Sequence, residues 1–342
     1  MIDSAGVQPR ARAAGLLARP PFAPARPAVL SIAAEVPDDR VSTSELAERL
    51  GVSEAWIVSR TGVRKRPVAR ADERLSDYAA RVGARALQRA GVDPAALDLV
   101  IVATMTQDEL TPNTAPLVAH AVGARAAGAV DVGAACTGFL SGVACAAGQI
   151  ESGRARWVLV IGADFITRVV NWEDKRTAPL FGDGAGAVVV GPAGAGPGAI
   201  GPIVLGADGT GAETIQIAHA DRQIRMDGPE VYKHAVARLS EATLQAVGSV
   251  GLTLDDMDLF VYHQANARIV RAVAEKLQLT PERVVDCIET LGNSSAATLP
   301  LGLAVAERDG RLRPGKLVLL AAFGAGFTWG GGVIEWGGGE LG

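Results

Sequence analysis

The sequence predicts a layered α/β fold built from two halves of similar order. Short, continuous apolar runs at residues 99–104 and 158–162 have the composition of parallel strands that are covered on both faces. Such runs alternate with longer segments of helical character, and the alternation recurs after a glycine-rich stretch at residues 191–201. We therefore expect two duplicated βαβ-type halves, residues 28–195 and residues 196–342.

The composition is that of a large globular protein. The 342 residues are 49% hydrophobic and 20% charged, which is sufficient for a sizeable core. The net charge of −4 and the aromatic content of 4% argue against a nucleic-acid partner. The three cysteines, Cys136, Cys145 and Cys287, include no CxxC pair. They argue against a disulfide framework or a zinc site and favour a reducing, cytoplasmic location.

Two segments need to be distinguished from targeting or membrane elements. Residues 1–27 combine arginines with a proline cluster and lack a signal-peptide core, so we predict a disordered N-terminal tail. Residues 132–150 carry no charge over a length close to that of a membrane span. Repeated glycines and the flanking acids Asp131 and Glu151 favour a buried helix instead, so no membrane span is expected.

The first half is expected to contain strands at residues 28–32, 99–104, 127–132, 158–162 and 186–190. Helices are expected at residues 43–50, 53–60, 75–90, 113–122 and 136–150. Ser42 and Glu45 have the spacing of a capping box at the start of the first helix, and Ser53 is expected to cap the second. The basic stretch at residues 60–66 is either a solvated loop or a patch for phosphates, with Trp56 as a neighbouring stacking face.

The second half repeats this alternation. Helices are expected at residues 231–248, after Asn266 as far as Leu277, and at residues 297–308. Strands are expected at residues 259–262, 318–322 and 328–334.

Residues 131–140 suggest a nucleophile. An apolar strand ends in a turn of small residues, and Cys136 follows where a buried helix is expected to begin. Unpaired N–H groups and the positive end of the helix dipole favour a thiolate at such a position. A thiolate there could carry an acyl group, although most free cysteines are inert packing residues.

Two further polar residues follow strands or turns in the second half. His263 ends the strand at residues 259–262, and Asn293 follows a glycine before a helix. Positions of this kind converge at one edge of an open α/β sheet. Each residue also has a structural interpretation: His263 as a satisfied core histidine, Asn293 as a cap or turn. Asp183, in a glycine-rich stretch, is interpreted as a turn former rather than a base.

Taken together, these motifs resemble the thiolase superfamily, and more closely the β-ketoacyl-acyl-carrier-protein synthase III family. The resemblance covers residues 28–336, and its matching stretches are residues 56–66, 131–139, 181–187, 262–266, 292–297 and 323–331. It implies the five-layer αβαβα thiolase-like fold and a homodimer.

The resemblance also implies a reaction that initiates fatty-acid or polyketide synthesis. Cys136 would take an acyl group from acyl-CoA, and the backbone N–H groups of Cys136 and Ala325 would hold the oxyanion. His263 and Asn293 would donate hydrogen bonds to the thioester carbonyl of malonyl on an acyl carrier protein. No metal or redox cofactor is implied.

Binding residues carry over from the family in the same way. CoA and substrate contacts are expected at Trp56, Arg60, Lys175, Arg176 and Gly228. Carrier-protein docking is expected at Arg268, Arg271 and Lys276. Thr111 matches a gate at the partner subunit's acyl pocket that is often phenylalanine, so we expect room for primers longer or more branched than acetyl. The segment between Gly211 and Met226 is short for the family.

One alternative remains serious: a related enzyme of a secondary-metabolite pathway that acylates an alcohol or amine, or that loads a starter unit, with the same residues. A degradative thiolase would need a second cysteine after Cys287, and none is present. A chalcone-synthase type fits the motifs less well. A non-catalytic partner subunit would have lost Cys136, and a cysteine hydrolase would leave Asn293 unexplained.

Overall fold

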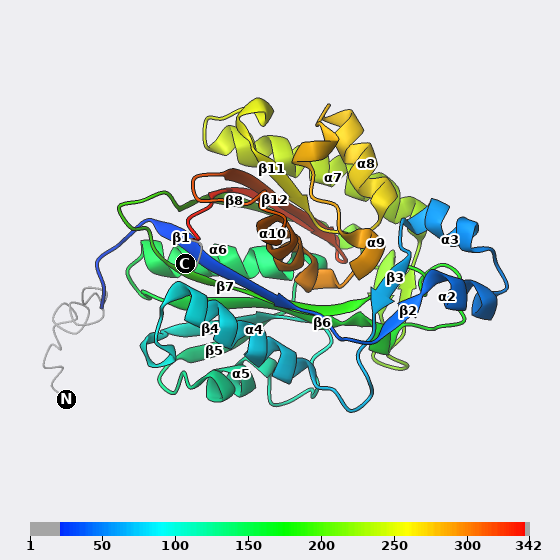
Figure 1. Cartoon of the computed structure of the whole chain (residues 1–342), viewed down its shortest axis with the longest axis horizontal. Helices are drawn as coiled ribbons and strands as arrows, with labels where there is room; N and C mark the ends of the chain where they lie inside the picture. The colour runs from blue at the N-terminus through cyan, green and yellow to red at the C-terminus, as the bar shows by residue number, and fades with distance from the viewer. Residues whose placement is uncertain (1–20, 339–342) are drawn as a thin grey trace, which may run out of the picture.

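The structure is a computed structural model, and it describes residues 21–338. Its described part contains two sheets that lie face to face with helices between and outside them (Figure 1).

The first sheet has the strand order β1-β7-β6-β4-β5. Its strands are β1 (Pro27–Glu35), β4 (Leu99–Ala103), β5 (Gly128–Val132), β6 (Val158–Phe165) and β7 (Asp183–Pro192). β4 runs parallel to both β5 and β6, whereas β7 is antiparallel to β6 and β1. Every residue of β6 is buried, which explains its continuous apolar sequence.

The second sheet repeats the first. Its strands, in the order β11-β12-β13-β8, are β8 (Ala199–Ala207), β11 (Leu259–Tyr262), β12 (Leu317–Gly324) and β13 (Thr328–Glu335). β11 and β12 are parallel, and the other pairs are antiparallel. Val284 adds a parallel bridge to Phe260, in the place that β5 has beside β4. Strand order and direction therefore follow one scheme in both halves, as a duplicated unit predicts.

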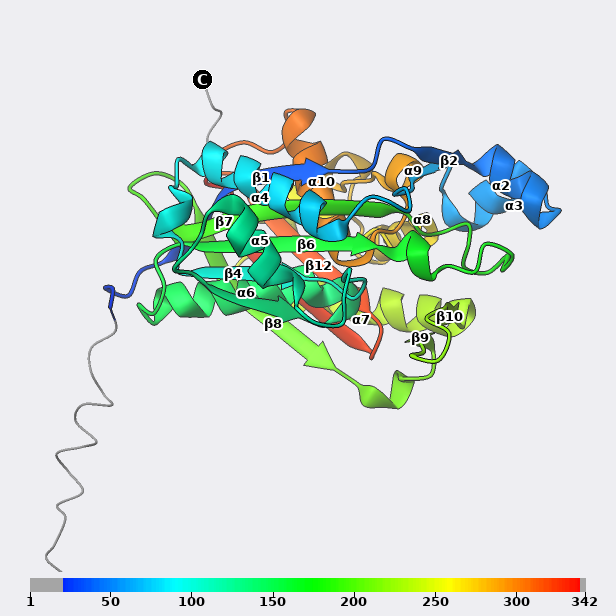
Figure 2. The same ribbon diagram turned by 90° about the horizontal axis from the view of Figure 1, so that it is seen from below.

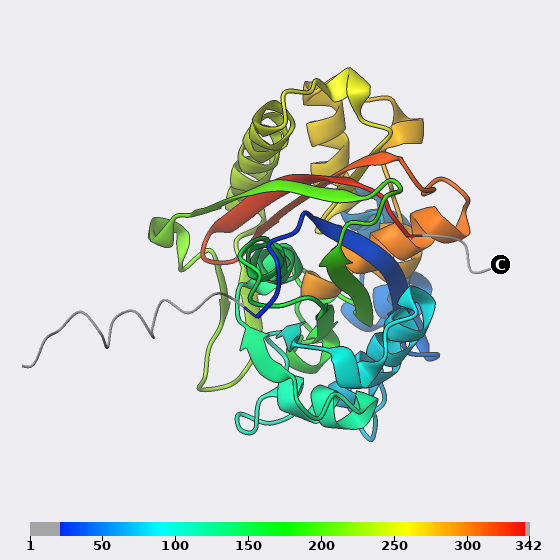
Figure 3. The same cartoon turned by 90° about the vertical axis from the view of Figure 1, so that its left-hand side faces the viewer.

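Six helices complete the layers. α4 (Leu75–Ala90) and α5 (Thr114–Val122) cover the outer face of the first sheet (Figure 2). α7 (Gly228–Ser249) and α8 (Ala267–Lys276) cover the second, and α6 (Gly138–Glu151) and α10 (Thr298–Arg308) lie between the sheets (Figure 3). The αβαβα order of the predicted fold is confirmed.

The uncharged segment of α6 is explained by its place between two sheets. A Cβ added at Gly142 would lie 2.9 Å from a side-chain carbon of Val160, so glycine permits a close approach of helix and sheet. Over residues 21–338, no helix is both long and apolar enough to cross a membrane.

Smaller elements gather at one end of the sheets, at the right of Figure 1. They are β2 (Arg40–Ser42), α2 (Thr43–Leu50), α3 (Glu54–Thr61), β3 (Lys65–Pro67) and α9 (Ile288–Leu291). The capping box of Ser42 and Glu45 is confirmed, and Ser53 caps α3 by accepting from the Trp56 N–H. A hairpin that was not predicted from the sequence, β9 (Ile215–Ile217) with β10 (Ile224–Met226), lies nearby.

Two boundaries differ from expectation. The predicted tail extends too far, because Phe22 N–H donates to the Gly153 carbonyl at 3.0 Å and β1 already begins at Pro27. The rest of the predicted tail, residues 1–20, lies outside the described residues. The stretch interpreted as the crossing between halves is shorter than predicted, because β8 begins at Ala199.

Candidate active site

The duplicated fold places the turns next to Cys136 and Asn293 at equivalent points, each just before an inner helix. Cys136 lies in the 3-10 turn Ala135–Thr137 that leads into α6. Asn293 precedes the corresponding turn Ser295–Ala297 that leads into α10. In both turns a non-glycine residue adopts a left-handed backbone, Ala135 with φ 45° and Ser295 with φ 50°. Such backbone strain is concentrated where function constrains the chain.

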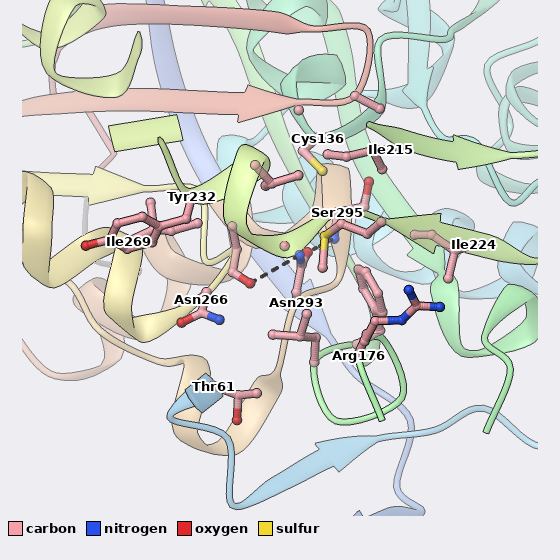
Figure 4. Close-up of a pocket in the computed structure, with 18 of the residues that line it drawn as sticks. Thr61, Cys136, Arg176, Ile215, Ile224, Tyr232, Asn266, Ile269, Asn293 and Ser295 are labelled. Carbon is pink, nitrogen blue, oxygen red and sulfur yellow. Dashed lines mark hydrogen bonds between the residues drawn. The ribbon is translucent and has the colours of Figure 1, made fainter. Parts of the chain in front are cut away.

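Both residues open into one cavity of about 570 Å³ that His263 also lines. Figure 4 shows Cys136, Ser295 and Asn293 next to one another in this cavity, with Thr61 and Arg176 farther from the sulfur. The structure therefore brings together all three residues that the sequence predicts for catalysis.

The surroundings of the Cys136 sulfur favour the neutral thiol. Burial raises its pKa to about 12, and a hydrogen bond with the Ser295 hydroxyl opposes that shift only in part. Burial therefore works against the thiolate that a helix N-terminus favours. Cys136 lies two residues before Gly138, the first residue of α6.

The end of β12 forms the wall opposite Cys136. A Cβ added at Gly324 would lie 2.9 Å from the Cys136 nitrogen and 3.0 Å from its Cβ, so only glycine allows this approach. The next residue, Ala325, lines the cavity. This places the backbone of Cys136 and the backbone after Gly324 side by side, as an oxyanion hole of two N–H groups requires.

His263 is held at the carboxyl end of β11. Its backbone N–H donates to the Ala321 carbonyl at 2.8 Å. Its ring nitrogen Nδ1 lies 2.6 Å from the Thr298 hydroxyl oxygen. The residue is only 1% exposed, and burial lowers its pKa to about 3. The ring is therefore neutral at physiological pH.

Asn293 presents its amide nitrogen to the cavity. Its side-chain oxygen accepts the Ser295 N–H at 2.9 Å, and its own backbone N–H donates to the Leu180 carbonyl at 2.9 Å. Its side-chain nitrogen is 3.5 Å from the Ala265 carbonyl, a long contact that leaves the amide able to donate to a substrate. The turn interpretation is therefore also correct, because the contact with the Ser295 N–H orients the amide, whereas the residue that precedes the helical turn is Ser294.

Asp164, at the end of β6, is a site residue that the sequence reasoning missed. It is fully buried and accepts hydrogen bonds from Met105 N–H, Ala296 N–H and the Thr106 hydroxyl. Burial raises its pKa. It ties the end of β4 to the turn after Asn293, and an acid inside an apolar strand was the signal available in the sequence.

Asp183 proves to be more than a turn former. It is the first residue of β7 and is buried, and it accepts from Ala69 N–H and from Thr167. Burial raises its pKa to about 6. Since it does not line the cavity, its role is to connect segments of the first half.

The predicted CoA contacts all line the same cavity, at Trp56, Arg60, Lys175, Arg176 and Gly228. The Arg60 guanidinium lies 4.2 Å from the centre of the Trp56 ring. The hairpin β9–β10 supplies apolar lining that was not predicted, from Ile215, Ile224 and Met226. These residues come from the segment between Gly211 and Met226.

The predicted docking residues lie on α8. Arg268 lines the cavity mouth, and Arg271 and Lys276 are exposed on the same helix. Thr111 is exposed and does not line the cavity of its own chain.

Comparisons with known proteins agree with this geometry. A family model described as 3-oxoacyl-[acyl-carrier-protein] synthase III matches residues 130–209, and the model of its C-terminal part matches residues 248–336. A β-ketoacyl-[acyl-carrier-protein] synthase III of Symbiobacterium thermophilum is 42% identical over 88% of this chain and 96% of its own length.

Solved structures give the same result. The synthase III of Thermus thermophilus is 42% identical with a TM-score of 0.87, over 91% of this chain and 99% of its own. The priming β-ketosynthase of the R1128 polyketide pathway is 38% identical with a TM-score of 0.87, over 92% of this chain and 98% of its own. The chain therefore belongs to the β-ketoacyl-[acyl-carrier-protein] synthase III family of acyltransferases.

Proposed function

We propose that this enzyme condenses an acyl-CoA primer with malonyl on an acyl carrier protein, with loss of CO₂, and so starts a fatty-acid or polyketide chain. The observation that carries the proposal is the convergence of Cys136, His263 and Asn293 in one cavity that extends to Trp56 and Arg60.

In the first half-reaction the Cys136 sulfur attacks the acyl-CoA carbonyl. A carbon–sulfur bond to Cys136 forms, the bond to the CoA sulfur breaks, and CoA leaves with the proton that the thiol gives up. The developing oxyanion is held by the backbone N–H groups of Cys136 and Ala325. One donor of this kind typically contributes about 3–4 kcal/mol to the transition state.

In the second half-reaction malonyl-carrier loses CO₂, and the electron pair of the broken carbon–carbon bond forms an enolate. His263 and Asn293 donate hydrogen bonds to the enolate oxygen. The enolate carbon attacks the acyl group, and the bond to Cys136 breaks with its electron pair left on the sulfur. The sulfur then takes a proton from water, and the β-ketoacyl-carrier leaves. Neutral donors suit this step, because they stabilise the oxyanion without protonating the enolate carbon.

The substrates are proposed to approach from the side of α3 and α8. The stacked pair of Trp56 and Arg60 offers an aromatic face and a cation for the CoA adenine and phosphates. Lys175 and Arg176, which line the same cavity, add positive charge. The exposed cations of α8, Arg268, Arg271 and Lys276, would dock an acidic carrier protein.

A homodimer is also part of the proposal. β5 ends the first sheet, and its central Val130 is 46% exposed. An edge strand with exposed apolar side chains is suited to pairing with a second copy. Such pairing would bring the loop of Thr111 to the partner subunit. We further expect the protein in the cytoplasm, with its carrier protein.

Whole-protein mass spectrometry tests the reaction. Wild type and Cys136→Ala are incubated with a panel of acyl-CoAs, and malonyl-carrier protein is then added. We expect an acyl adduct on the wild type alone, discharged as a β-ketoacyl-carrier with release of CO₂.

Two outcomes would contradict the proposal. No adduct from any acyl-CoA would reject Cys136 as the nucleophile. An adduct that does not react with malonyl-carrier, but whose acyl group is transferred to an alcohol or amine, would instead identify the acyltransferase alternative.

A further inference from the structure

His263 is held at its Nδ1 atom by a buried threonine on the neighbouring inner helix. Thr298, the first residue of α10, places its hydroxyl oxygen 2.6 Å from His263 Nδ1. Thr298 is 1% exposed and does not line the cavity, so it meets the histidine and not the substrate. Because His263 lines the cavity and Nδ1 is engaged, Nε2 is the ring nitrogen left for a substrate.

The Thr298 hydroxyl has one hydrogen and two possible acceptors. Its oxygen also lies 2.9 Å from the Ser295 carbonyl oxygen, which can only accept. If the hydrogen points to Ser295, then Nδ1 must donate to the hydroxyl, and Nε2 carries a lone pair. If the hydrogen points to Nδ1, then Nε2 carries the proton. The direction of the Thr298 hydroxyl therefore determines whether His263 Nε2 presents a donor or an acceptor to the cavity.

The second arrangement leaves no buried group without a partner. The Ser295 carbonyl also accepts the backbone N–H of Thr298, so it remains paired when the hydroxyl turns to Nδ1. The condensation step needs a donor at Nε2, and the neutral ring has only one proton to place.

We propose that Thr298 is a positioning residue that donates its hydroxyl proton to His263 Nδ1 and thereby fixes the tautomer whose Nε2–H faces the substrate. This inference rests on the proposed function. It assigns the ring nitrogen of His263 that carries the proton, which the heavy-atom positions of His263 and Asn293 alone do not determine.

The substitution Thr298→Val tests it, because valine keeps the shape and removes both the donor and the acceptor. Thr298→Ser keeps the hydroxyl. Thr243→Val is a matched control, since Thr243 is also fully buried and its hydroxyl contacts the Leu239 carbonyl and the Tyr262 hydroxyl. It removes a buried hydroxyl away from the cavity.

Two half-reactions are measured for each variant: formation of the acyl-Cys136 adduct and decarboxylation of malonyl-carrier. In Thr298→Val, we expect decarboxylation to fall about 10²–10³-fold, as for the loss of one oxyanion donor, and the adduct to form within a few-fold of the wild-type rate. Thr298→Ser should decarboxylate malonyl-carrier at close to the wild-type rate, and Thr243→Val should leave the rates of both half-reactions unchanged. An equal loss of both half-reactions in Thr298→Val, or no loss in either, would overturn the proposal.

The tautomer itself is read by nitrogen NMR of protein labelled at its four histidines. The signals of His263 are identified by their absence from His263→Ala. We expect a proton on Nε2 and none on Nδ1 in the resting wild type, and a proton on Nδ1 would overturn the proposal. Because this measurement needs no substrate, it remains decisive even if condensation itself is not observed.

Discussion

Gly324 lies against the backbone of Cys136. A Cβ at position 324 would come within 2.9 Å of the Cys136 nitrogen, and no flexible side chain is available to move aside. The contact joins the end of β12 to the turn that carries the nucleophile. A thioester carbonyl could therefore approach the two backbones without a Cβ of residue 324 in the way.

The substitution Gly324→Ala should block this arrangement. We expect acylation of Cys136 to slow by at least about 10²-fold, because the methyl group displaces one oxyanion donor or the sulfur. Mass spectrometry of the acyl adduct over time gives the rate. The control is Gly148→Ala on α6, where an added Cβ meets nothing within 4 Å. Full-speed acylation of Gly324→Ala would mean that this contact does not shape the site.

The reactivity of Cys136 should increase steeply with pH. Because burial raises the pKa of the thiol to about 12, only a small fraction should be thiolate at neutral pH. Each increase in pH should raise the thiolate fraction. We expect alkylation by iodoacetamide to accelerate about tenfold per pH unit between pH 7 and pH 10. Cys145 is exposed, so it is first replaced by alanine, and alkylation of Cys136 is then measured. A plateau below pH 9 would show instead that the helix end prevails over burial.

Elements defined by local chemistry were predictable from the sequence. The capping box of Ser42 and Glu45 and the strand Leu259–Tyr262 match the structure, because each depends on residues within a few positions. The hairpin of Ile215–Ile217 and Ile224–Met226 was not predictable in this way. Its strands are short, and its apolar side chains are explained only by the cavity they line.

In the site too, some features follow from local sequence and others only from the fold. Cys136, His263 and Asn293 are visible as polar residues at strand and turn ends. The pKa of Cys136 depends on all the atoms packed around the sulfur, and those come from distant segments. Thr298 likewise acquires its role only when the fold brings it to His263, 35 positions away in the sequence.

Asp164 should stabilise the fold as well as the site. Asp164→Asn keeps the size but turns an N–H group toward a backbone donor, either Ala296 or Met105. We expect the free energy of unfolding to fall by about 1–3 kcal/mol, the range for a buried donor left without an acceptor. Chemical denaturation measures it. The exposed cap Asp93→Asn is the control and should change stability by less than about 0.5 kcal/mol. An unchanged midpoint in Asp164→Asn would contradict this role.

The stacked pair of Arg60 and Trp56 should act on CoA binding alone. Arg60→Ala removes the cation 4.2 Å from the ring centre, so we expect KM for acyl-CoA to rise about three- to tenfold, as for an exposed cation–π or phosphate contact, with kcat unchanged. Steady-state kinetics gives both constants. Arg156→Ala removes a similar pair with Trp157 outside the cavity and is the control. A fall in kcat with KM unchanged would place Arg60 in the chemistry instead.

Thr111 should determine which primers the enzyme accepts. It is exposed and lies outside the cavity of its own chain, as expected of a residue that gates the partner subunit's pocket. The wild type should use branched or longer primers at least as well as acetyl-CoA. Thr111→Phe should lower kcat/KM for a six-carbon primer by at least about tenfold and leave acetyl-CoA within a few-fold, because a pocket discriminates by the volume it can hold. The exposed Thr280→Phe is the control.

Mixed dimers then decide which subunit the gate serves. In one mixture, copies carrying Thr111→Phe are paired with copies carrying Cys136→Ala. The intact Cys136 there faces an unmodified Thr111 from its partner and should accept the six-carbon primer. In the other, wild type is paired with copies that carry both substitutions, so the intact Cys136 faces phenylalanine and should reject it. The two heterodimers are first separated from homodimers by a different affinity tag on each copy, so every dimer assayed contains one intact nucleophile and one modified gate. A gate that acts across the dimer lets only the first heterodimer use the long primer, whereas a gate within its own subunit gives the reverse. Equal use of the long primer by the two purified heterodimers, or its use by the second alone, would remove Thr111 from the partner's pocket.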